Sequence, residues 1–258
     1  MVAKVKPLVV VLGSTASGKS DLAMMLAKRF NGEIICADSQ AIYRGMDIGT
    51  AKPSREDRAL VKHHLLDIRN PDESYSVAQF QQDAQEAIAG INTRGKLPIM
   101  VGGSGLYIDS VIYNYSFISD GQRDDVNPRH LAKNVGPTNK ELREDTLIIG
   151  IQRNPEELEA RIVERTDGMV EAGLVGEVKN LVTKYGRDAM GLSNIRYQIF
   201  ADYLAGLIGL DEAMQKFVRN DMLLSKKQKT WFKRNKSIQW VSNSSKAVEI
   251  TTTFLNNY

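Results

Sequence analysis

The sequence has little cysteine and no long apolar run. Cys36 is the single cysteine among 258 residues, which excludes an internal disulfide and a zinc site built from cysteines alone. One thiol also fits a reducing compartment. The apolar run Leu8–Leu12 is shorter than a signal-peptide core of about 7–15 residues, and no run approaches the roughly 18 residues of a membrane span. We therefore expect a cytoplasmic protein with no membrane partner.

An excess of charge of one sign is also nearly absent. The chain carries 34 Lys and Arg against 31 Asp and Glu, a formal net charge of +3. This total does not by itself indicate a protein that binds nucleic acid. The charge is unevenly distributed, however, because residues 201–258 hold nine basic and five acidic residues while residues 1–200 are almost neutral. The 42% hydrophobic content is typical of a globular protein and excludes a collagen-like or wholly disordered chain.

Short apolar runs alternate with segments of helical periodicity. Strands are predicted at Leu8–Leu12, Glu33–Ala37, Leu97–Val101 and Leu147–Ile151. Helices are predicted over Ser20–Phe30, Ser76–Ile91, around Leu106–Ile108, from Pro155 onward and over Leu210–Asn235. This alternation indicates an α/β fold with a parallel sheet flanked by helices. We expect the first part of a catalytic core over residues 1–115, a short insertion or loop at 116–145, and core completion with a helical C-terminal part over 146–258.

A glycine-rich turn joins the first predicted strand to the first predicted helix. It fits G-x-x-x-x-G-K-[ST], and the phosphate-binding residues are Gly13, Ser14, Thr15, Ala16, Ser17, Gly18, Lys19 and Ser20. The glycines let backbone amides wrap around a phosphate, and the helix adds its positive N-terminal end. Lys19 is expected to neutralise phosphate oxygens, and the Ser20 hydroxyl to reach a bound Mg²⁺. The motif predicts a P-loop NTPase-like fold with a di- or triphosphate ligand; the alternative is a chance glycine turn.

Asp38 directly follows the second predicted strand. Ligands of an open parallel sheet bind beyond the carboxyl ends of its strands, so Asp38 is expected to face the ligand of the glycine-rich turn. We interpret it as a general base or a metal-side carboxylate; the alternative is a helix-capping residue. A guanine-reading N-K-x-D motif is absent, because Asn139-Lys140-Glu141-Leu142 lacks the final Asp.

Longer motifs accompany the glycine-rich turn and Asp38. Residues Asp38–Pro53 read DSQAIYRGMDIGTAKP, His63–Asp67 read HHLLD, Gly102–Tyr107 read GGSGLY, and Gln228–Phe232 read QKTWF. Together with the glycine-rich turn, these motifs resemble the tRNA dimethylallyltransferases, also called tRNA isopentenyltransferases. The resemblance spans nearly the whole chain.

The resemblance implies transfer of a dimethylallyl group from dimethylallyl diphosphate to N6 of the adenine 3′ of the anticodon, with the tRNA anticodon stem-loop as partner. Asp38 would be the general base, Mg²⁺ the cofactor, and Lys19, Thr15 and Arg44 further catalytic residues at the leaving diphosphate. The residues expected to meet the adenine are Asp38, Ser39, Gln40, Ala41 and Ser104, the last in place of the family's usual threonine. Thr15 has the alternative of a turn residue, and Ser39 and Gln40 that of strand-end caps. We interpret His63 and His64 as structural.

A basic segment lies near the C-terminus. Between Lys226 and Lys236, six of eleven residues are basic and none is acidic. The residues expected from the resemblance to contact tRNA are Lys226, Lys227, Gln228, Lys229, Thr230, Trp231, Phe232 and Lys233. Basic side chains bind phosphates and make binding sensitive to salt. The alternative is a solvated helix face above core aromatic residues.

Two features depart from the family pattern. Its members usually carry a sizeable helical insertion, which is reduced here to residues 116–145, with Asn127–His130 as the nearest remnant of its recognition motif. The family's Gly-Tyr pair appears as Ile195-Arg196-Tyr197-Gln198, without the glycine. Two other functions therefore stay open: prenyl transfer to a free adenylate, and a P-loop small-molecule kinase whose lid would use Arg123, Arg129 and Arg143. We expect a monomer.

Overall fold

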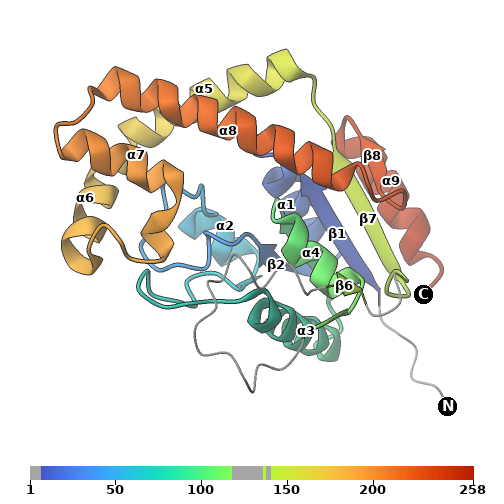
Figure 1. Ribbon diagram of the computed structural model, residues 1–258. Helices are drawn as coiled ribbons and strands as arrows, with labels where there is room; N and C mark the ends of the chain where they lie inside the picture. Colours follow the sequence, from blue (N-terminus) through green and yellow to red (C-terminus); the bar gives the residue numbers. More distant parts are fainter. Residues whose placement is uncertain (1–6, 118–135, 138–140) are drawn as a thin grey trace.

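The computed structural model describes residues 7–117, 136–137 and 141–258. Its main element is a six-stranded parallel sheet with strand order β3-β2-β4-β1-β7-β8 (Figure 1). The strands are β1 (Leu8–Gly13), β2 (Gly32–Ala37), β3 (His63–His64), β4 (Leu97–Gly102), β7 (Thr146–Ile151) and β8 (Gln239–Val241). The four predicted strands are confirmed as the central four. The two edge strands were not predicted, because two and three residues are too few to show an apolar pattern.

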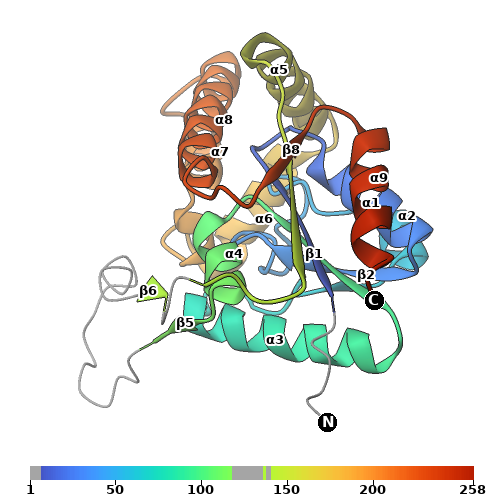
Figure 2. The ribbon, with the colours of Figure 1, turned by 90° about the vertical axis from the view of Figure 1, so that its right-hand side faces the viewer.

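Helices cover both faces of the sheet, so its central strands are buried on both sides. Side chains of β1 alternate: Val9 and Val11 pack on one face, while Leu8, Val10 and Leu12 pack on the other. The first face is covered by α1 (Lys19–Arg29) and α9 (Ser244–Leu255), the second by α3 (Val77–Thr93) and α4 (Gly105–Ile112) (Figure 2). The short helix α2 (Arg55–Leu60) leads into β3.

A group of helices follows β7 and stands over the carboxyl ends of the strands (Figure 1). It comprises α5 (Pro155–Glu171), α6 (Leu174–Tyr185), the 3₁₀ turn Gly191–Ser193, α7 (Ile195–Leu204) and α8 (Leu210–Phe232). The group has its own core, in which the buried rings of Phe200 and Phe217 meet edge to face with centroids 5.8 Å apart. The predicted helical C-terminal part is confirmed, although its long helix ends at Phe232 and not at Asn235.

The expected insertion falls largely outside the described residues. At its flanks, β5 (Tyr115–Ser116) pairs antiparallel with β6 (Gly136–Pro137). The remnant motif Asn127–His130 and the lid candidates Arg123 and Arg129 all lie outside the described residues, and the boundaries 116 and 145 stay a prediction. Among the helices that the structure describes, none is long and apolar enough to cross a membrane.

Candidate functional site

The glycine-rich turn forms a loop around the N-terminus of α1. Gly18 has φ 90°, a left-handed conformation that glycine adopts without strain. Gly13 admits no side chain, because a Cβ there would lie 2.6 Å from the Oγ of Ser17. The Nζ of Lys19 reaches back to the carbonyl oxygen of Ser14 at 3.2 Å. The loop therefore holds the Lys19 ammonium among backbone groups at the carboxyl end of β1.

This loop opens into a cavity of about 1020 Å³ at the carboxyl edge of the sheet, a volume typical of a small-molecule site. The predicted site residues that line it are Thr15, Ala16, Gly18, Lys19, Ser20, Asp38, Ser39, Gln40, Ala41, Ser104, Lys227, Gln228 and Trp231. Gly13, Ser14 and Ser17 shape the loop from behind, and Ser17 is fully buried. The structure therefore gathers the phosphate loop and the Asp38 segment around one space.

The two carboxylate oxygens of Asp38 have different surroundings. Its Oδ1 accepts hydrogen bonds from the backbone N–H groups of Gln40 at 2.8 Å and Ala41 at 3.3 Å, which caps the turn after β2. Its Oδ2 makes no hydrogen bond with any residue that the structure describes. One carboxylate oxygen is thus fixed by the backbone, and the other is available to accept a proton in the cavity.

The neighbouring polar residues form the same wall as Asp38. The backbone N–H of Ser39 donates to the Oγ of Ser104 at 3.1 Å, which ties the turn after β2 to the turn after β4. The side-chain oxygen of Gln40 is buried and accepts no hydrogen bond from the described part of the chain. Ser39 and Gln40 therefore present hydrogen-bonding groups beside Asp38.

Lys19 sits in a strongly positive part of the cavity. Burial lowers the pKa of its ammonium from 10.5 to about 8, although the Asp38 carboxylate opposes this shift. The guanidinium groups of Arg165 and Arg196 add to the lowering of the Lys19 pKa. An anion bound here would relieve the repulsion among these cations, so the cavity favours a phosphate group.

Three arginines that were not predicted from the sequence donate hydrogen bonds to the phosphate loop. Arg153 donates to the carbonyl oxygen of Ser17 at 3.2 Å, Arg161 to that of Ala16 at 2.8 Å, and Arg165 to the Oγ of Thr15 at 2.7 Å. The last two lie on α5, and both line the cavity. Their spacing of four residues places them on one helix face, which is the signal that the sequence carried.

Asp221 of α8 holds two of the cavity's guanidinium groups. Its carboxylate is fully buried and pairs with Arg165 through one oxygen and with Arg196 through the other, the latter at 2.7 Å. Arg196 directly precedes Tyr197, at the position where the resemblance led us to expect a glycine. It lines the cavity, and its buried carboxylate partner fixes both guanidinium groups in position.

Gln228 contacts the phosphate loop itself. Its Oε1 accepts a hydrogen bond from the backbone N–H of Thr15 at 2.8 Å, and its Nε2 donates to the carbonyl oxygen of Gly103 at 3.0 Å. The Thr15 amide, expected among the phosphate-binding amides, therefore already has a partner. Gly103 has no room for a side chain, because a Cβ would lie 2.3 Å from the Gln228 amide nitrogen.

The two aromatic residues of the basic segment have different positions. Trp231 lines the cavity, and its Nε1 donates to the Oδ2 of Asp109 at 2.7 Å. A Cβ at Gly105 would lie 2.3 Å from the Trp231 ring, which explains that glycine. Phe232 is only 2% exposed and packs in the core beneath the sheet. The Phe232 side chain is therefore withdrawn from the surface, and the expected contact of this residue with tRNA stays an untested prediction.

The basic side chains of the segment lie on the surface of α8. Lys226, Lys227, Lys229 and Lys233 are all exposed, as is Thr230, whose hydroxyl donates to the Lys226 carbonyl oxygen at 2.9 Å. Lys227 additionally lines the cavity. The segment thus combines a charged outer surface with a buried aromatic residue, and contact of its lysines with tRNA stays a prediction.

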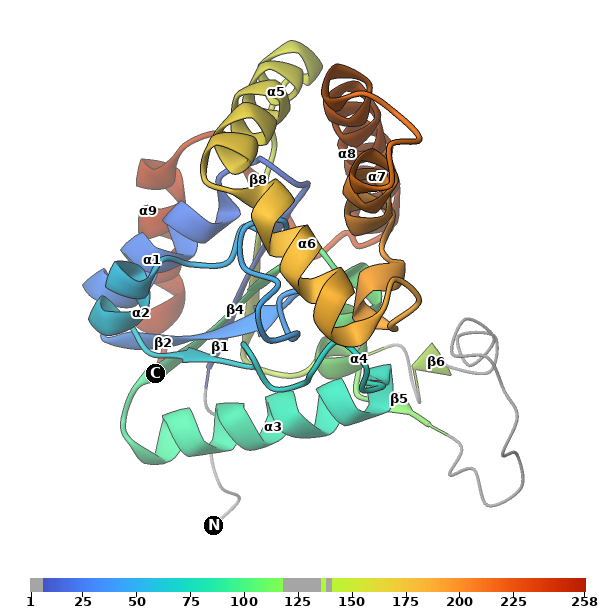
Figure 3. The same ribbon diagram turned by 90° about the vertical axis from the view of Figure 1, so that its left-hand side faces the viewer.

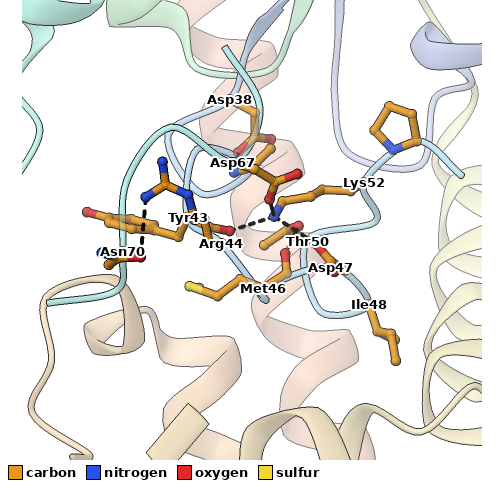
Figure 4. A network of polar contacts seen from close by, with 12 residues as sticks. Asp38, Tyr43, Arg44, Met46, Asp47, Ile48, Thr50, Lys52, Asp67 and Asn70 are labelled. Atoms are coloured by element: carbon orange, nitrogen blue, oxygen red, sulfur yellow. Dashed lines mark hydrogen bonds and ion pairs between the residues drawn. The ribbon is translucent and has the colours of Figure 1, made fainter. Parts of the chain in front are cut away.

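Arg44 does not lie at the phosphate site. Its guanidinium donates to the Oδ1 of Asn70 at 3.3 Å and approaches Glu73 at 3.9 Å, and half of its side chain is exposed (Figure 4). It is absent from the residues that line the cavity. Nothing in the structure tests the expected contact of Arg44 with the leaving diphosphate, which stays a prediction. The adjacent Tyr43 turns its side chain into a core, and the chain then carries Arg44 outward.

The histidines have structural partners, as predicted. His63 Nδ1 lies 2.8 Å from the Val61 carbonyl oxygen, and His64 Nε2 lies 2.8 Å from a carboxylate oxygen of Glu33. Within the described ranges, no three His, Cys, Asp or Glu side chains form a group able to hold a metal ion. Burial raises the pKa of Cys36 to about 12, so its thiol stays protonated and unreactive.

Known proteins resemble this chain in sequence. The family model described as IPP transferase matches residues 41–144 and 126–235. The tRNA dimethylallyltransferase of Anoxybacillus flavithermus is 38% identical over 277 residues, covering 90% of this chain and 89% of that protein. Because this alignment is longer than the 258-residue chain, the relative contains residues that have no counterpart here.

Solved structures resemble the chain over nearly its whole length. The full-length tRNA isopentenylpyrophosphate transferase of Bacillus halodurans is 34% identical, with a TM-score of 0.83, covering 98% of this chain and 96% of its own. The tRNA delta(2)-isopentenylpyrophosphate transferase of Staphylococcus epidermidis is 32% identical, also with a TM-score of 0.83, covering 98% of this chain and 99% of its own.

Proposed function

The chain belongs to the IPP transferase family, and we propose that it transfers a dimethylallyl group from dimethylallyl diphosphate to N6 of the adenine 3′ of the anticodon in tRNA. One observation carries this proposal: Asp38, which has one carboxylate oxygen without a hydrogen bond from the described residues, and Lys19, in the phosphate loop, line the same cavity and interact electrostatically. Prenyl transfer to an amine needs a proton acceptor and a diphosphate-binding site within one cavity.

The reaction forms a bond between N6 and the allylic C1 and breaks the bond between C1 and the diphosphate oxygen. The electron pair of the broken bond leaves with the diphosphate, which Lys19 and the loop amides stabilise together with Arg165. The N6 lone pair is delocalised into the adenine ring, so this amine is a weak nucleophile. Asp38 Oδ2 takes the N6 proton as the new bond forms, which acts as general-base catalysis.

The residues present fit a bound Mg²⁺. Ser20 is exposed in the first turn of α1 and offers a hard oxygen ligand at the mouth of the phosphate loop. Mg²⁺ commonly takes one or two protein oxygens and completes its coordination with substrate phosphates and water. The Ser20 hydroxyl would hold the ion, which when bound supplies positive charge to the departing diphosphate.

The acceptor adenine has to leave its stack to reach Asp38. Extruding a loop base costs a few kcal/mol of unstacking, on the order of what a fitted pocket returns. Ser39, Gln40 and Ser104 line the same wall as Asp38 and offer hydrogen-bonding groups to the base edge. Ala41 completes this wall without a polar side chain.

The exposed lysines of α8 support tRNA as the acceptor. Lys227 lines the cavity while Lys226, Lys229 and Lys233 extend the positive surface along the same helix. Such a strip binds a phosphate backbone, which a free adenylate lacks. We propose that the enzyme acts as a monomer in the cytoplasm.

A labelling assay tests the function. The protein is incubated with radiolabelled dimethylallyl diphosphate and Mg²⁺, in parallel with tRNA, with AMP, or with ATP and small acceptors. We expect label on tRNA, at the adenine 3′ of the anticodon. Label on AMP and none on tRNA would replace the proposed acceptor by a free nucleotide.

One of the arginines expected in the lid of a kinase, Arg143, does not lie near the phosphate loop. Arg143 hydrogen-bonds the Thr146 hydroxyl at 3.3 Å, at the first residue of β7. Because the strands are parallel, this is the edge of the sheet opposite to the phosphate loop. Turnover of ATP without prenyl transfer in the same assay would nevertheless overturn both prenyl-transfer proposals.

A further inference from the structure

The segment Tyr43–Lys52 is the part of the longest sequence motif that the proposed chemistry leaves without a role. It follows the Asp38 wall immediately, and its last residues, Thr50, Ala51 and Lys52, return to line the cavity. Its one residue expected at the diphosphate, Arg44, points away from the cavity. Two sets of polar contacts nevertheless hold the segment, one made by Lys52 and the other by Glu177.

Lys52 holds the segment from inside (Figure 4). Its side chain is only 1% exposed, and its Nζ donates to the Tyr43 carbonyl oxygen at 2.5 Å, to Asp47 Oδ1 at 2.8 Å and to Asp67 Oδ1 at 2.5 Å. Three acceptors satisfy all three donors of the ammonium group. The other oxygen of Asp67 accepts from Arg58 at 2.8 Å. Lys52 therefore joins both ends of its own segment to the chain that precedes α3.

Glu177 of α6 holds the segment from outside. Its Oε2 accepts from the backbone N–H groups of Asp47 at 2.8 Å and Ile48 at 2.7 Å, and its Oε1 accepts from that of Gly49 at 3.0 Å. The Tyr197 hydroxyl donates to Oε1 at 2.7 Å. Figure 3 shows α6 running alongside the loop that follows β2. One carboxylate thus fixes three consecutive amides by charge-assisted hydrogen bonds.

Close packing accompanies these hydrogen bonds. A Cβ at Gly49 would lie 2.8 Å from the Tyr197 ring and 3.1 Å from Leu174, so only glycine fits between the segment and the helices. Met46 is fully buried in the core of the helical group. The segment is therefore part of the interface between the sheet's loops and the helices α6 and α7.

The segment is also tied to the Asp38 wall. The N–H of Asp67 donates to the Ala41 carbonyl oxygen at 3.4 Å, and the N–H of Arg69 to that of Ile42 at 3.0 Å. The Ala41 amide in turn donates to Asp38 Oδ1. A shift of Asp67 would therefore displace the wall that carries Asp38.

We propose that Lys52 and Glu177 are positioning residues for the acceptor: they fix the Tyr43–Lys52 segment and, through Asp67 and Ala41, the Asp38 wall against which the adenine is presented. The inference rests on the proposed function. Neither side chain makes a hydrogen bond or ion pair with the phosphate loop in the described part of the chain. Their loss should thus impair use of tRNA and leave binding of dimethylallyl diphosphate unchanged.

The central test replaces Glu177→Gln, which keeps the size of the side chain and places an N–H donor against at least one of the three amides. The matched control is Glu171→Gln, because the Glu171 side chain is exposed and makes no hydrogen bond or ion pair within the described ranges. Hydrogen exchange at the amides of residues 47–49 measures the local anchor. Steady-state kinetics with tRNA and a binding titration with dimethylallyl diphosphate measure its consequence.

We expect the Glu177→Gln amides to exchange at least roughly tenfold faster. The kcat/KM for tRNA should fall by up to about 10²-fold, because a misplacement of roughly 1 Å can cost that much, and a rise in KM should contribute to this loss. The Kd for dimethylallyl diphosphate should stay within about twofold, and Glu171→Gln should match the unaltered protein. A merely structural role would lower the active fraction, and hence kcat, without moving KM.

A milder variant covers the case in which Glu177→Gln does not fold. Tyr197→Phe keeps the ring beside Gly49 and removes only the hydroxyl that orients Glu177, so it should shift exchange and KM in the same direction by a smaller factor. Faster exchange with an unchanged KM for tRNA, or equal changes in KM and in the diphosphate Kd, would overturn the inference. Absence of any transfer to tRNA by the unaltered protein would overturn the proposed function instead.

Discussion

Gln228 Oε1 accepts a hydrogen bond from the backbone N–H of Thr15 at 2.8 Å, although the two residues are 213 positions apart. The Gln228 Nε2 donates at the same time to the Gly103 carbonyl oxygen at 3.0 Å. One side-chain amide therefore joins the helix that carries the basic strip to the phosphate loop after β1 and to the turn after β4.

The variant Gln228→Leu should destabilise the protein, because it leaves one backbone donor and one backbone acceptor without partners. Such a loss costs about 1–3 kcal/mol of the free energy of unfolding. Urea unfolding followed by circular dichroism measures it. Gln215→Leu, on an exposed position of the same helix, is the control, and an equal shift in both variants would contradict the assignment.

Asp38→Asn should fold normally and lose transfer. Asparagine retains the carbonyl oxygen that accepts from the Gln40 and Ala41 amides, so the turn stays capped, but it cannot take a proton from N6. We expect the single-turnover rate to fall by about 10²–10⁴-fold, with an unchanged Kd for dimethylallyl diphosphate. Near-normal turnover would remove Asp38 as the base.

The pKa of about 8 at Lys19 predicts how diphosphate affinity depends on pH. Below pH 8 the ammonium is charged in the free protein, so affinity is full. Above pH 8 the free protein loses this proton, while a bound diphosphate favours the charged form, so affinity should fall up to tenfold per pH unit. Titrations with dimethylallyl diphosphate between pH 6.5 and 9.5, on the order of one pH unit either side of that value, measure it.

Lys19→Arg is the matched variant for that profile. Its guanidinium stays charged throughout this range, so its affinity should not fall above pH 8, whatever its absolute value. The same decline in both proteins would show that another group titrates.

Replacement of Arg165 by glutamine should weaken binding of dimethylallyl diphosphate far more than replacement of Arg44 by glutamine. Arg165 contacts Thr15 in the phosphate loop and lines the cavity, whereas Arg44 binds Asn70 outside it. A hydrogen bond to a charged group is worth about 1.5–3 kcal/mol, so Arg165→Gln should raise the Kd for dimethylallyl diphosphate by roughly 10- to 100-fold. Arg44→Gln should change it less than about twofold. A larger rise in this Kd for Arg44→Gln would support the sequence-based prediction that Arg44 contacts the diphosphate.

The exposed lysines near the end of α8 should make tRNA binding depend on salt concentration. Replacing Lys226, Lys229 and Lys233 together by alanine removes three exposed cations from α8 and its C-terminal cap. Each lost phosphate contact reduces the slope of log K against log salt by about 0.7–0.9, so the slope should fall by roughly 2 to 3. The Kd for dimethylallyl diphosphate should not move. An unchanged slope would place the tRNA elsewhere on the protein.

Features that depend on neighbouring residues were predicted more accurately from the sequence than features that depend on contacts between distant parts of the chain. The four central strands and most helices were predicted because neighbouring residues carry the apolar periodicity. Helix α7 was missed because its buried residues include Arg196 and Tyr197, which blur an apolar face. The motif did not indicate that Phe232 is buried, because a motif does not state which way a side chain points. The next residue, Lys233, which caps the helix, is exposed.

By itself, the sequence determined the phosphate loop and the position of Asp38 at the end of its strand. Both follow from short-range rules: glycines where the backbone must turn tightly, and parallel strands whose carboxyl ends share an edge. Only the tertiary structure decided that Arg165 reaches Thr15 across 150 positions and Glu177 reaches Asp47 across 130. Such contacts depend on how the helical group packs onto the sheet, and no local pattern specifies that packing.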